Sequence, residues 1–341
     1  MAVGIDMPNV LLTQRCVRAC PYCFASKHMT EGAPEAVLSW EDFIYVADFL
    51  QNAGEQRFPM LGGEPTLHPQ FVEFVAYALD RGFRVHVFTS GVVSEHTLQA
   101  IASEFREEPF DRFHFICNLN DPEQTPTSAS ELRNVHRFLA RMGERVIPGF
   151  NIYRTDFTLD FLFEAINRYG LQRTLRLGLA HPIPGASTSC IRIHDIEHVI
   201  EQMFSFRPLF ERMRVKPGLD CGFPMCRFTE QQLGWLMRHG AGISEFGCSP
   251  VLDIGPDLMV WPCFPLSSFH RKSLLEFNSQ KELLAYYRRI HNVVRTEIGG
   301  LYPECDTCWY REDGRCAGGC IAHSVGRFQS EARLRLPEVY L

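Results

Sequence analysis

The chain has 341 residues, of which 45% are hydrophobic, so it can bury a full core and is expected to hold one large domain and a smaller one. Its net charge of −6 gives no basic footprint for nucleic acid. No export signal opens the sequence and no uncharged apolar run reaches the length of a membrane span, so its thirteen cysteines are expected to be reduced thiols in a cytoplasmic protein.

Short apolar runs alternate with amphipathic segments in the first half of the chain, which is typical of β/α units around a parallel sheet. Strands are expected at residues 10–13, 58–61, 84–89, 113–119, 146–153 and 174–180. Helices are expected at 39–52, 69–79, 94–105, 130–142 and 159–168. This order predicts an α/β fold, a partial (β/α)6 TIM-like barrel whose site lies at the carboxyl ends of its strands.

The pattern changes after a Pro/Gly cluster at residues 181–185. A helix is expected at 195–213, and a hairpin at 251–254 and 258–261. These changes predict three regions. They are a core barrel at 1–190, a helical linker at 191–245 that carries Cys221 and Cys226, and a small cysteine-rich domain at 246–341.

Three cysteines, Cys16, Cys20 and Cys23, follow the first expected strand. Their C-x3-C-x2-C spacing lets three thiolates hold one iron–sulfur cube and leaves its fourth iron open, and open metal positions are where chemistry occurs. A zinc site would need a distant fourth ligand, and a disulfide would leave an odd thiol. Residues 16–24 resemble the cluster loop of radical S-adenosylmethionine (SAM) enzymes, whose open iron is chelated by the amino and carboxylate groups of SAM.

A Gly-Gly-Glu-Pro turn after the second strand resembles the motif that binds the SAM ammonium in this family, although alone it is an ordinary strand-to-helix connection. By the same resemblance, Asn118 would contact the ribose, Ile152 would pack on the adenine, and Arg154 would pair with the SAM carboxylate. The alternative for each is a turn residue, a packed side chain or a surface charge. The SAM-binding residues implied are Tyr22, Gly62, Gly63, Glu64, Pro65, Thr89, Ser90, Asn118, Ile152 and Arg154.

Eight further cysteines lie between residues 221 and 320, the number that two closed 4Fe–4S clusters need. Their spacing resembles the SPASM domain of peptide-modifying radical SAM enzymes, but the gap from Cys308 to Cys316 is longer and no cysteine follows Cys320, so Cys221, Cys226 or His323 would supply a last ligand. One auxiliary cluster is assigned to Cys226, Cys248, Cys263 and Cys320, and a second to Cys221, Cys305, Cys308 and Cys316. The alternatives are a single auxiliary cluster with Cys221 or Cys226 free, and a zinc ribbon at 305–320.

The resemblance implies that SAM is reductively cleaved to a 5′-deoxyadenosyl radical, which abstracts a hydrogen from the substrate. The product would be an oxidation, a crosslink, a thioether or an epimer. Candidate hydrogen donors are Cys117, Cys190 or an unligated Cys221 or Cys226, with a buried structural thiol as the alternative for Cys117. Candidate acid–base groups are His181, Asp220, Asp253 and Asp257, each of which also fits a turn or cap.

SPASM-type enzymes mostly modify ribosomal peptides or protein side chains, so a peptide substrate is expected. The chain starts close to its first cysteine motif, so no N-terminal peptide-binding or cobalamin domain is expected. A peptide substrate would then need a separate recognition protein or would dock directly to the sheet edge or cleft. A flavodoxin or ferredoxin would supply electrons, with no nucleic-acid or membrane partner. The alternatives are a dehydrogenase or epimerase of a small molecule such as an aminoglycoside, a non-catalytic iron–sulfur electron-transfer module, and a zinc-containing nucleic-acid binder.

Overall fold

The computed structural model describes residues 8–26, 36–183, 187–242, 246–297 and 299–329. The strands are β1 (Asn9–Leu11), β2 (Arg57–Leu61), β3 (Arg84–Thr89), β4 (Phe113–Asn118), β5 (Val146–Ile152), β6 (Thr174–Leu179), β7 (Lys216–Leu219), β8 (Asp253–Ile254), β9 (Met259–Trp261) and β10 (Lys272–Ser273). The helices are α2 (Trp40–Asn52), α3 (Phe71–Asp80), α4 (Glu95–Glu104), α5 (Ala129–Met142), α6 (Asp160–Tyr169), α7 (Ile196–Ser205), α8 (Arg207–Met213), α9 (Glu230–His239), α10 (Gln280–Glu297), α11 (Trp309–Glu312) and α12 (Ile321–Gln329). Each strand and helix predicted for the barrel lies within two residues of an observed one.

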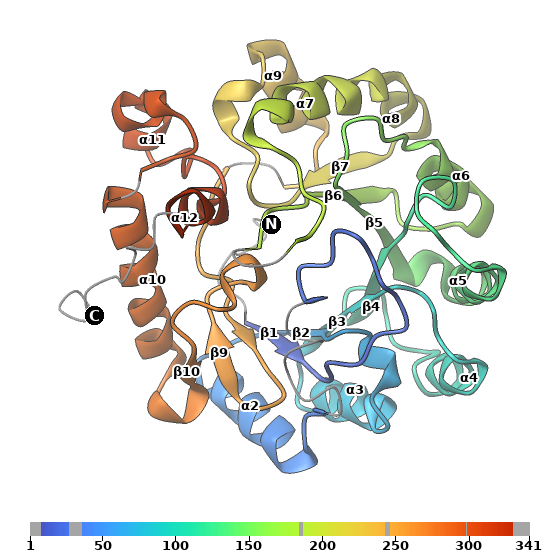
Figure 1. Cartoon of the computed structure of the whole chain (residues 1–341). Helices are drawn as coiled ribbons and strands as arrows, with labels where there is room; N and C mark the ends of the chain where they lie inside the picture. The colour runs from blue at the N-terminus through green and yellow to red at the C-terminus, as the bar shows by residue number, and fades with distance from the viewer. Residues whose placement is uncertain (1–7, 27–35, 184–186, 243–245, 298, 330–341) are drawn as a thin grey trace.

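One curved sheet organises the molecule, with its strands in the order β10-β9-β8-β1-β2-β3-β4-β5-β6-β7. From β8 through β1 to β7 every neighbouring pair is parallel, whereas β9 is antiparallel to β8 and β10. Figure 1 shows α2 to α8 around the outside of this sheet. The α/β barrel-like fold is therefore confirmed, and the carboxyl ends of the parallel strands share one rim. In the parts of the chain that the structure describes, no helix is long and apolar enough to span a bilayer.

Serine side chains set where two of the outer helices begin. Ser39 and Ser94 precede α2 and α4, and their hydroxyl oxygens accept hydrogen bonds from the backbone N–H groups of Asp42 and Thr97. Such N-caps satisfy donors that have no partner inside the helix, and each contributes about 1 kcal/mol. The helix starts predicted at these serines are confirmed.

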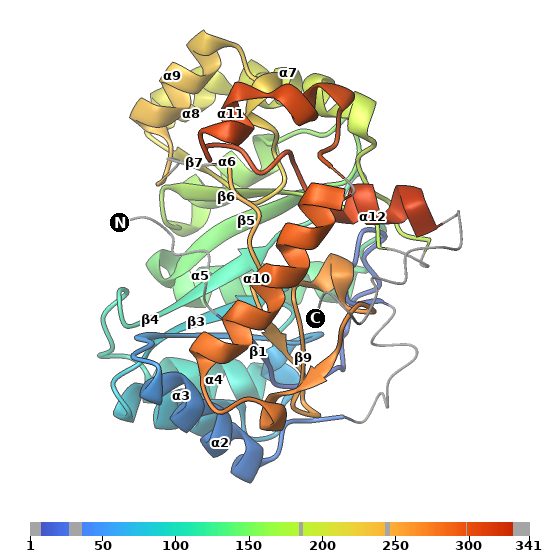
Figure 2. The ribbon, with the colours of Figure 1, turned by 90° about the vertical axis from the view of Figure 1, so that its left-hand side faces the viewer.

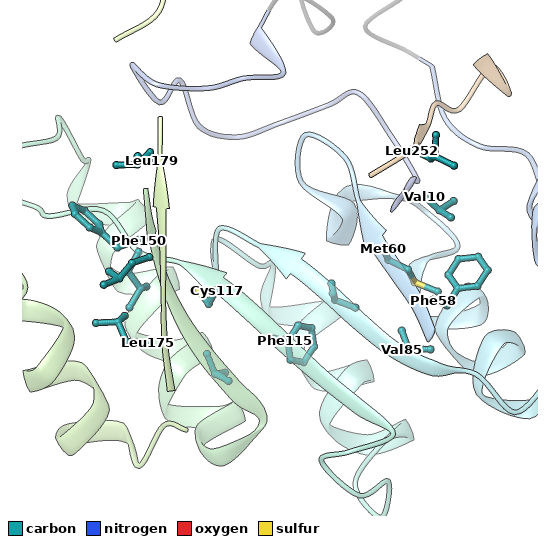
Figure 3. Close-up of a cluster of buried hydrophobic side chains, with 14 of the residues drawn as sticks. Val10, Phe58, Met60, Val85, Phe115, Cys117, Phe150, Leu175, Leu179 and Leu252 are labelled. Carbon is teal, nitrogen blue, oxygen red and sulfur yellow. The ribbon is translucent and has the colours of Figure 1, made fainter. Parts of the chain in front are cut away.

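The main core fills the space between the convex face of the sheet and the helices. Successive strand residues point to opposite faces, so Val85, Phe115 and Cys117 face the helices and lie in this core. Figure 3 shows these side chains with Val10, Phe150 and others along the same side of the sheet. The intervening residues, among them Phe88 and Asn118, therefore face the concave interior.

The helix predicted at 195–213 is wrong in one respect, because the structure divides it into α7 and α8 at Phe206. Pro208 lies in the first turn of α8. A proline has no N–H to donate and its ring collides with the carbonyl four residues earlier, so the first helix cannot continue through it. The break turns α8 toward β7, which the sequence reading placed inside a helical linker.

The C-terminal part of the chain extends the core sheet. The predicted hairpin is confirmed as β8 and β9, and β8 pairs in parallel with β1 through Asn9 opposite Asp253. At the other edge β7 pairs with β6. The predicted boundaries at residues 190 and 245 stay predictions, but strands from all three predicted regions belong to one sheet.

A buried carboxyl group lies where β1 meets β8. Asp253 is 1% exposed, and Asn9 Nδ2 donates a hydrogen bond to its Oδ1 at 2.7 Å. Burial raises the pKa of Asp253 to about 7, although hydrogen bonds from Asn9, Trp261 and the Phe264 backbone oppose the rise. The folded chain therefore holds this proton at pH values where an unfolded chain has released it.

This proton predicts a pH-dependent stability. Because the folded pKa lies above the unfolded value, the contribution of Asp253 is fully present below about pH 4 and is lost as the pH rises to about 7. Between pH 5 and pH 8 we expect the apoprotein to lose about 2–3 kcal/mol of unfolding free energy from this group. Urea titrations of wild type and Asp253→Asn at both pH values measure this loss of unfolding free energy. Equal pH slopes for the two proteins would contradict the prediction.

Candidate active site

Three cysteines lie together in the loop that follows β1. Cys23 donates its backbone N–H to the carbonyl of Cys20, and the Arg18 backbone N–H points at the sulfur of Cys16. Burial, reinforced by the neighbouring thiols, raises the pKa of Cys16 to about 11 and that of Cys23 to about 12. A metal centre bound in this loop would have to deprotonate Cys16 and Cys23, whose raised pKa values keep them neutral in its absence.

Arg18 fastens this loop to the far side of the barrel. Its side chain is only 6% exposed, its Nε lies 2.5 Å from Glu131 Oε1, and its Nη1 donates to the Asn118 carbonyl at 3.0 Å. Such burial does not fit a solvated surface charge. The contacts tie the cysteine loop to the end of β4 and the start of α5.

The Gly-Gly-Glu-Pro turn packs directly against the chain that leads into the cysteine loop. Gly63 and Glu64 donate their backbone N–H groups to the carbonyls of Thr13 and Arg15 at 2.9 and 2.7 Å. A Cβ on Gly63 would lie 2.2 Å from the Arg15 oxygen. The backbone of the segment after β1 therefore occupies the space beside Gly63, and glycine permits that close approach.

Glu64 is the polar centre of the site. Its side chain is fully buried, and its Oε1 accepts hydrogen bonds from Thr66 N, Thr66 Oγ1 and Thr89 Oγ1 at 3.3, 2.7 and 2.8 Å. Its Oε2 accepts from Ser90 N at 2.7 Å and Ser90 Oγ at 2.5 Å. Thr89 and Ser90, which were predicted at the mouth of the site, are therefore positioned by Glu64, which joins the ends of β2 and β3.

Asn118 carries an unsatisfied oxygen into the concave interior. Its Oδ1 is buried without a hydrogen-bond partner among the described residues. Gly149 lies opposite on β5, where a Cβ would be 2.9 Å from that oxygen. A buried acceptor without a donor costs about 1–3 kcal/mol. A ligand hydroxyl at this point would satisfy it, so the residues present fit a polar ligand such as a ribose.

Tyr22 and Asn120 connect this interior to the cysteine loop. The Tyr22 hydroxyl hydrogen-bonds Asn120 Oδ1, and Asn120 Nδ2 lies 3.6 Å from the sulfur of Cys20. The Tyr22 ring packs at 5.0 Å from that of Tyr153. The Tyr22 side chain is thus packed against another aromatic ring and also lies next to the predicted cofactor position.

Three predicted residues are not brought into this interior. Ile152 and Cys117 are fully buried in the core on the helix side of the sheet, and burial raises the pKa of Cys117 to about 12. Arg154 is directed to Asp156 in the loop after β5, with Nε and Nη2 each 2.5 Å from a carboxylate oxygen. The period-two alternation of a strand accounts for Ile152 and Cys117, because Asn118 and Asn151 occupy the inward positions next to them.

An ion pair that the sequence reading missed spans the interior. Arg176 on β6 pairs with Asp220, which follows β7, and its guanidinium lies 5.6 Å from the Phe88 ring on β3. Asp220 was a candidate acid–base group, and its pairing with Arg176 is new. The signal in the sequence was a single arginine at an inward position of an otherwise apolar strand.

Two histidines lie beside Asp220 and Cys221. His181 Nδ1 is 3.4 Å from His323 Nε2, and its Nε2 is 3.4 Å from the Cys221 carbonyl. Gly222, at φ +98°, makes room, because a Cβ there would lie 2.2 Å from the His181 ring. Cys190 lies elsewhere, on a segment whose Ser189 N–H bonds the Pro21 carbonyl at 2.8 Å, so the candidate donor adjoins the first cysteine loop.

Four C-terminal cysteines gather beside the barrel, and we call them the first thiol group. Cys248 and Cys263 pack against Cys320, and the Cys320 Cβ lies 3.4 Å from where a Cβ on Gly222 would be. Burial raises the pKa of Cys263 well above its usual value, and the nearby thiols of Cys320, Cys248 and Cys221 add to the rise. The members are Cys221, Cys248, Cys263 and Cys320.

A second thiol group lies farther along the C-terminal segment and consists of Cys226, Cys305, Cys308 and Cys316. The pKa of Cys226 is raised, first by partial burial and then by the thiols of Cys316, Cys305 and Cys308. The Cys305 sulfur would lie 3.8 Å from a Cβ on Gly318, and Gly318 donates its N–H to the Cys316 sulfur at 3.4 Å. These contacts place the four cysteines around one point.

The structure exchanges Cys221 and Cys226 relative to the sets assigned from sequence. Cys221 follows β7 directly and stays at the sheet. Five residues later Cys226 lies in the turn Met225–Arg227, and the Arg227 guanidinium stacks 3.8 Å from the Tyr302 ring, just before Cys305. The chain between the two cysteines thus carries Cys226 away to the other group.

No set of three or more ligand side chains in the described residues is close enough to hold a single metal ion. An iron–sulfur cube is wider than one ion, so its four thiolates lie farther apart than the ligands of zinc. Each thiol group has four cysteines, the number of thiolates that a closed 4Fe–4S cluster takes.

Comparison with known proteins agrees with this geometry. Residues 10–147 match the family described as the Radical SAM superfamily. Sequence relatives include an S-adenosylmethionine-dependent nucleotide dehydratase of Selenomonas ruminantium, 37% identical over 84 residues, and a PqqA peptide cyclase of Rhodopseudomonas palustris, 35% identical over 101 residues. These alignments cover 24% and 29% of this chain and 29% and 26% of the relatives, so the chain spans under a third of the length of either relative.

Solved structures share the whole fold. Streptococcus suis SuiB bound to the precursor peptide SuiA superposes with a TM-score of 0.63 at 12% identity, covering 93% of this chain and 72% of SuiB. The structure of anSMEcpe with bound AdoMet superposes with a TM-score of 0.60 at 14% identity, covering 98% of this chain and 95% of that one. At such identities the likeness establishes the fold alone.

Proposed function

We propose, from the radical SAM domain that residues 10–147 form, that this chain is a radical SAM enzyme that modifies a ribosomally made peptide. The observation that carries the proposal is the loop of three partly buried thiols, Cys16, Cys20 and Cys23, beside an interior where Asn118 lacks a hydrogen-bond partner among the described residues. A three-thiolate iron–sulfur cluster supplies, when bound, the electron that cleaves SAM to a 5′-deoxyadenosyl radical.

The chain's own residues would position the reactants. Asn118 Oδ1 would accept a hydrogen bond from the ribose, and Tyr22 would support the adenine from the cysteine loop. Glu64 would accept the SAM ammonium at the edge of its hydrogen-bond network. The Arg176–Asp220 pair faces the same interior and would orient a polar group of the substrate.

The two thiol groups would each hold an auxiliary 4Fe–4S cluster. Each contains four cysteines, the complement of a closed cluster, so neither leaves an iron open to substrate. Closed clusters carry electrons, so they favour products that need oxidation of the substrate, such as a crosslink or a thioether. Because Cys221 and Cys226 would both be cluster ligands, neither would be free to donate hydrogen in an epimerisation. All thirteen cysteines are free thiols in the structure, and a reducing cytoplasm would keep them available to clusters.

A peptide substrate is supported by the names of the relatives, a PqqA peptide cyclase and SuiB bound to a precursor peptide. A separate recognition protein would present the peptide, and a flavodoxin or ferredoxin would supply the electron. The nucleotide dehydratase favours a second candidate, dehydration of a nucleotide, through its 84-residue match.

The proposal predicts SAM cleavage by the reconstituted protein. With dithionite and SAM under anaerobic conditions, wild type should form 5′-deoxyadenosine, measured by liquid chromatography and mass spectrometry. Cys16→Ala/Cys20→Ala/Cys23→Ala should form none, because nothing would hold the open cluster. Val17→Ala, a change at an exposed position of the same loop, should keep the wild-type rate. If iron-loaded wild type bound no SAM and formed no 5′-deoxyadenosine, the proposal that this chain is a radical SAM enzyme would be refuted.

A further inference from the structure

Two polar side chains on α10 point toward the first thiol group. His291 and Arg295 are four residues apart, so they lie on one face of the helix. His291 is 1% exposed, and Arg295 hydrogen-bonds the thiol of Cys248. Figure 2 shows α10 crossing the front of the molecule, with its upper end beside α12, which follows Cys320. The helix thus presents a cation and an imidazole to the thiols.

Two nitrogens of the Arg295 guanidinium have no hydrogen-bond partner among the described residues. These atoms, Nε and Nη2, are buried, and the His291 ring lies against the backbone of Cys248. No carboxylate in the described ranges forms an ion pair with Arg295. Burial lowers the pKa of His291 to about 3, and the positive charge of Arg295 adds to this. The imidazole is therefore neutral, and Arg295 is the cation at this place.

A buried guanidinium without an anion is strongly unfavourable, so its retention calls for a negative partner. The thiol group supplies one only when its sulfurs are deprotonated. Val294, the neighbour of Arg295 on α10, packs in the same cluster as Cys248, Cys263 and Cys320, which places this end of the helix against the thiols. Four thiolates around a cube carry a net negative charge, and Arg295 lies where that charge would appear.

The position of Arg295 is fixed from the other side by Arg311. Arg311 Nη2 donates to the Arg295 carbonyl at 2.6 Å, and its Nη1 donates to the Cys305 carbonyl at 3.2 Å. The end of α10 is therefore anchored to the backbone of the second thiol group. The two Arg311 hydrogen bonds thus connect the second thiol group to the part of α10 that carries Arg295, next to the first thiol group.

We propose that Arg295 is the charge-compensating residue of a metal cluster held by Cys221, Cys248, Cys263 and Cys320, and that it sets that cluster's reduction potential. Positive charge next to a cluster stabilises the reduced form, which carries one more electron, so Arg295 raises the potential and favours electron acceptance. This inference rests on the proposed function, because it presupposes an auxiliary cluster. Arg295 acts through the cluster and is a positioning residue.

The test uses the full-length chain carrying Cys16→Ala/Cys20→Ala/Cys23→Ala, so that only auxiliary clusters contribute signals. Arg295→Met and Arg295→Lys are compared with Arg289→Met, the same chemical change at an exposed position of α10. Iron content and midpoint potentials come from metal analysis and redox titrations followed by electron paramagnetic resonance. We expect Arg295→Met to move one midpoint to a more negative value, with Arg295→Lys near the parent and Arg289→Met unchanged.

Stability of the iron-free protein gives a second readout. Removing an unpaired buried charge should raise the urea midpoint of apo Arg295→Met and leave that of Arg295→Lys near the parent. Full iron with unchanged potentials in Arg295→Met would overturn the inference. If Arg295→Met loses about four irons, recovery in Arg295→Lys supports charge compensation, whereas equal loss in both contradicts it. A parent that binds no iron would instead refute the auxiliary clusters of the proposed function.

Discussion

Cysteine-to-alanine pairs are expected to remove iron in two patterns that reveal which thiols share a cluster. Wild type should hold about twelve irons, and Cys221→Ala, Cys226→Ala or Cys320→Ala should each hold about eight. Cys221→Ala/Cys320→Ala should also hold about eight, because both cysteines belong to the first thiol group. Cys226→Ala/Cys320→Ala should fall to about four, because each change dismantles a different cluster.

The measurement is iron and sulfide per chain after anaerobic purification. Non-additivity within a pair identifies shared ligands without the need to assign spectra. The sets assigned from sequence predict the reverse, with the Cys221 pair at about four irons and the Cys226 pair at about eight. That result would contradict the grouping seen in the structure. A wild type with about eight irons would leave one auxiliary cluster, and zinc in place of iron would overturn both assignments.

Replacing Glu64 by glutamine is expected to destabilise the fold and abolish SAM binding together. The carboxylate accepts five hydrogen bonds in a fully buried place, two of them from the Ser90 backbone and hydroxyl. A glutamine amide nitrogen would face donors at one of the two oxygen positions and leave a buried N–H unsatisfied. Charged hydrogen bonds and unsatisfied donors of this kind are worth about 1–3 kcal/mol each, so we expect a loss of about 3–5 kcal/mol.

Urea unfolding of the iron-free protein measures this effect apart from any cofactor. Glu104→Gln, an exposed change at the end of α4, should stay within about 0.5 kcal/mol of wild type. SAM affinity of the reconstituted variant, measured by calorimetry, gives the second readout. A stability loss below about 1 kcal/mol would show that the five contacts do not hold the ends of β2 and β3 together.

Local features of this chain could be read from its residues because they depend on near neighbours. Serines at 39 and 94 cap helices wherever the chain folds, and the spacing of Cys16, Cys20 and Cys23 brings three thiols into one turn. The β/α alternation predicted the strands and helices of the barrel for the same reason. The role of Ile152 came from a resemblance and stays a prediction, and in the structure Ile152 lies in the core while the alternation of β5 gives the inward position to Asn151.

The sequence by itself therefore determined the fold class, the first cysteine loop and the Gly-Gly-Glu-Pro turn beside it. Only the tertiary structure decided that β7 and the β8–β9 hairpin join the core sheet, that Arg176 meets Asp220, and that Cys221 and Cys226 belong to different thiol groups. Each of these is a contact between residues far apart in the chain. Spacing along a sequence cannot choose between such partners, because the choice depends on how β7 and the turn after it pack against the C-terminal segment.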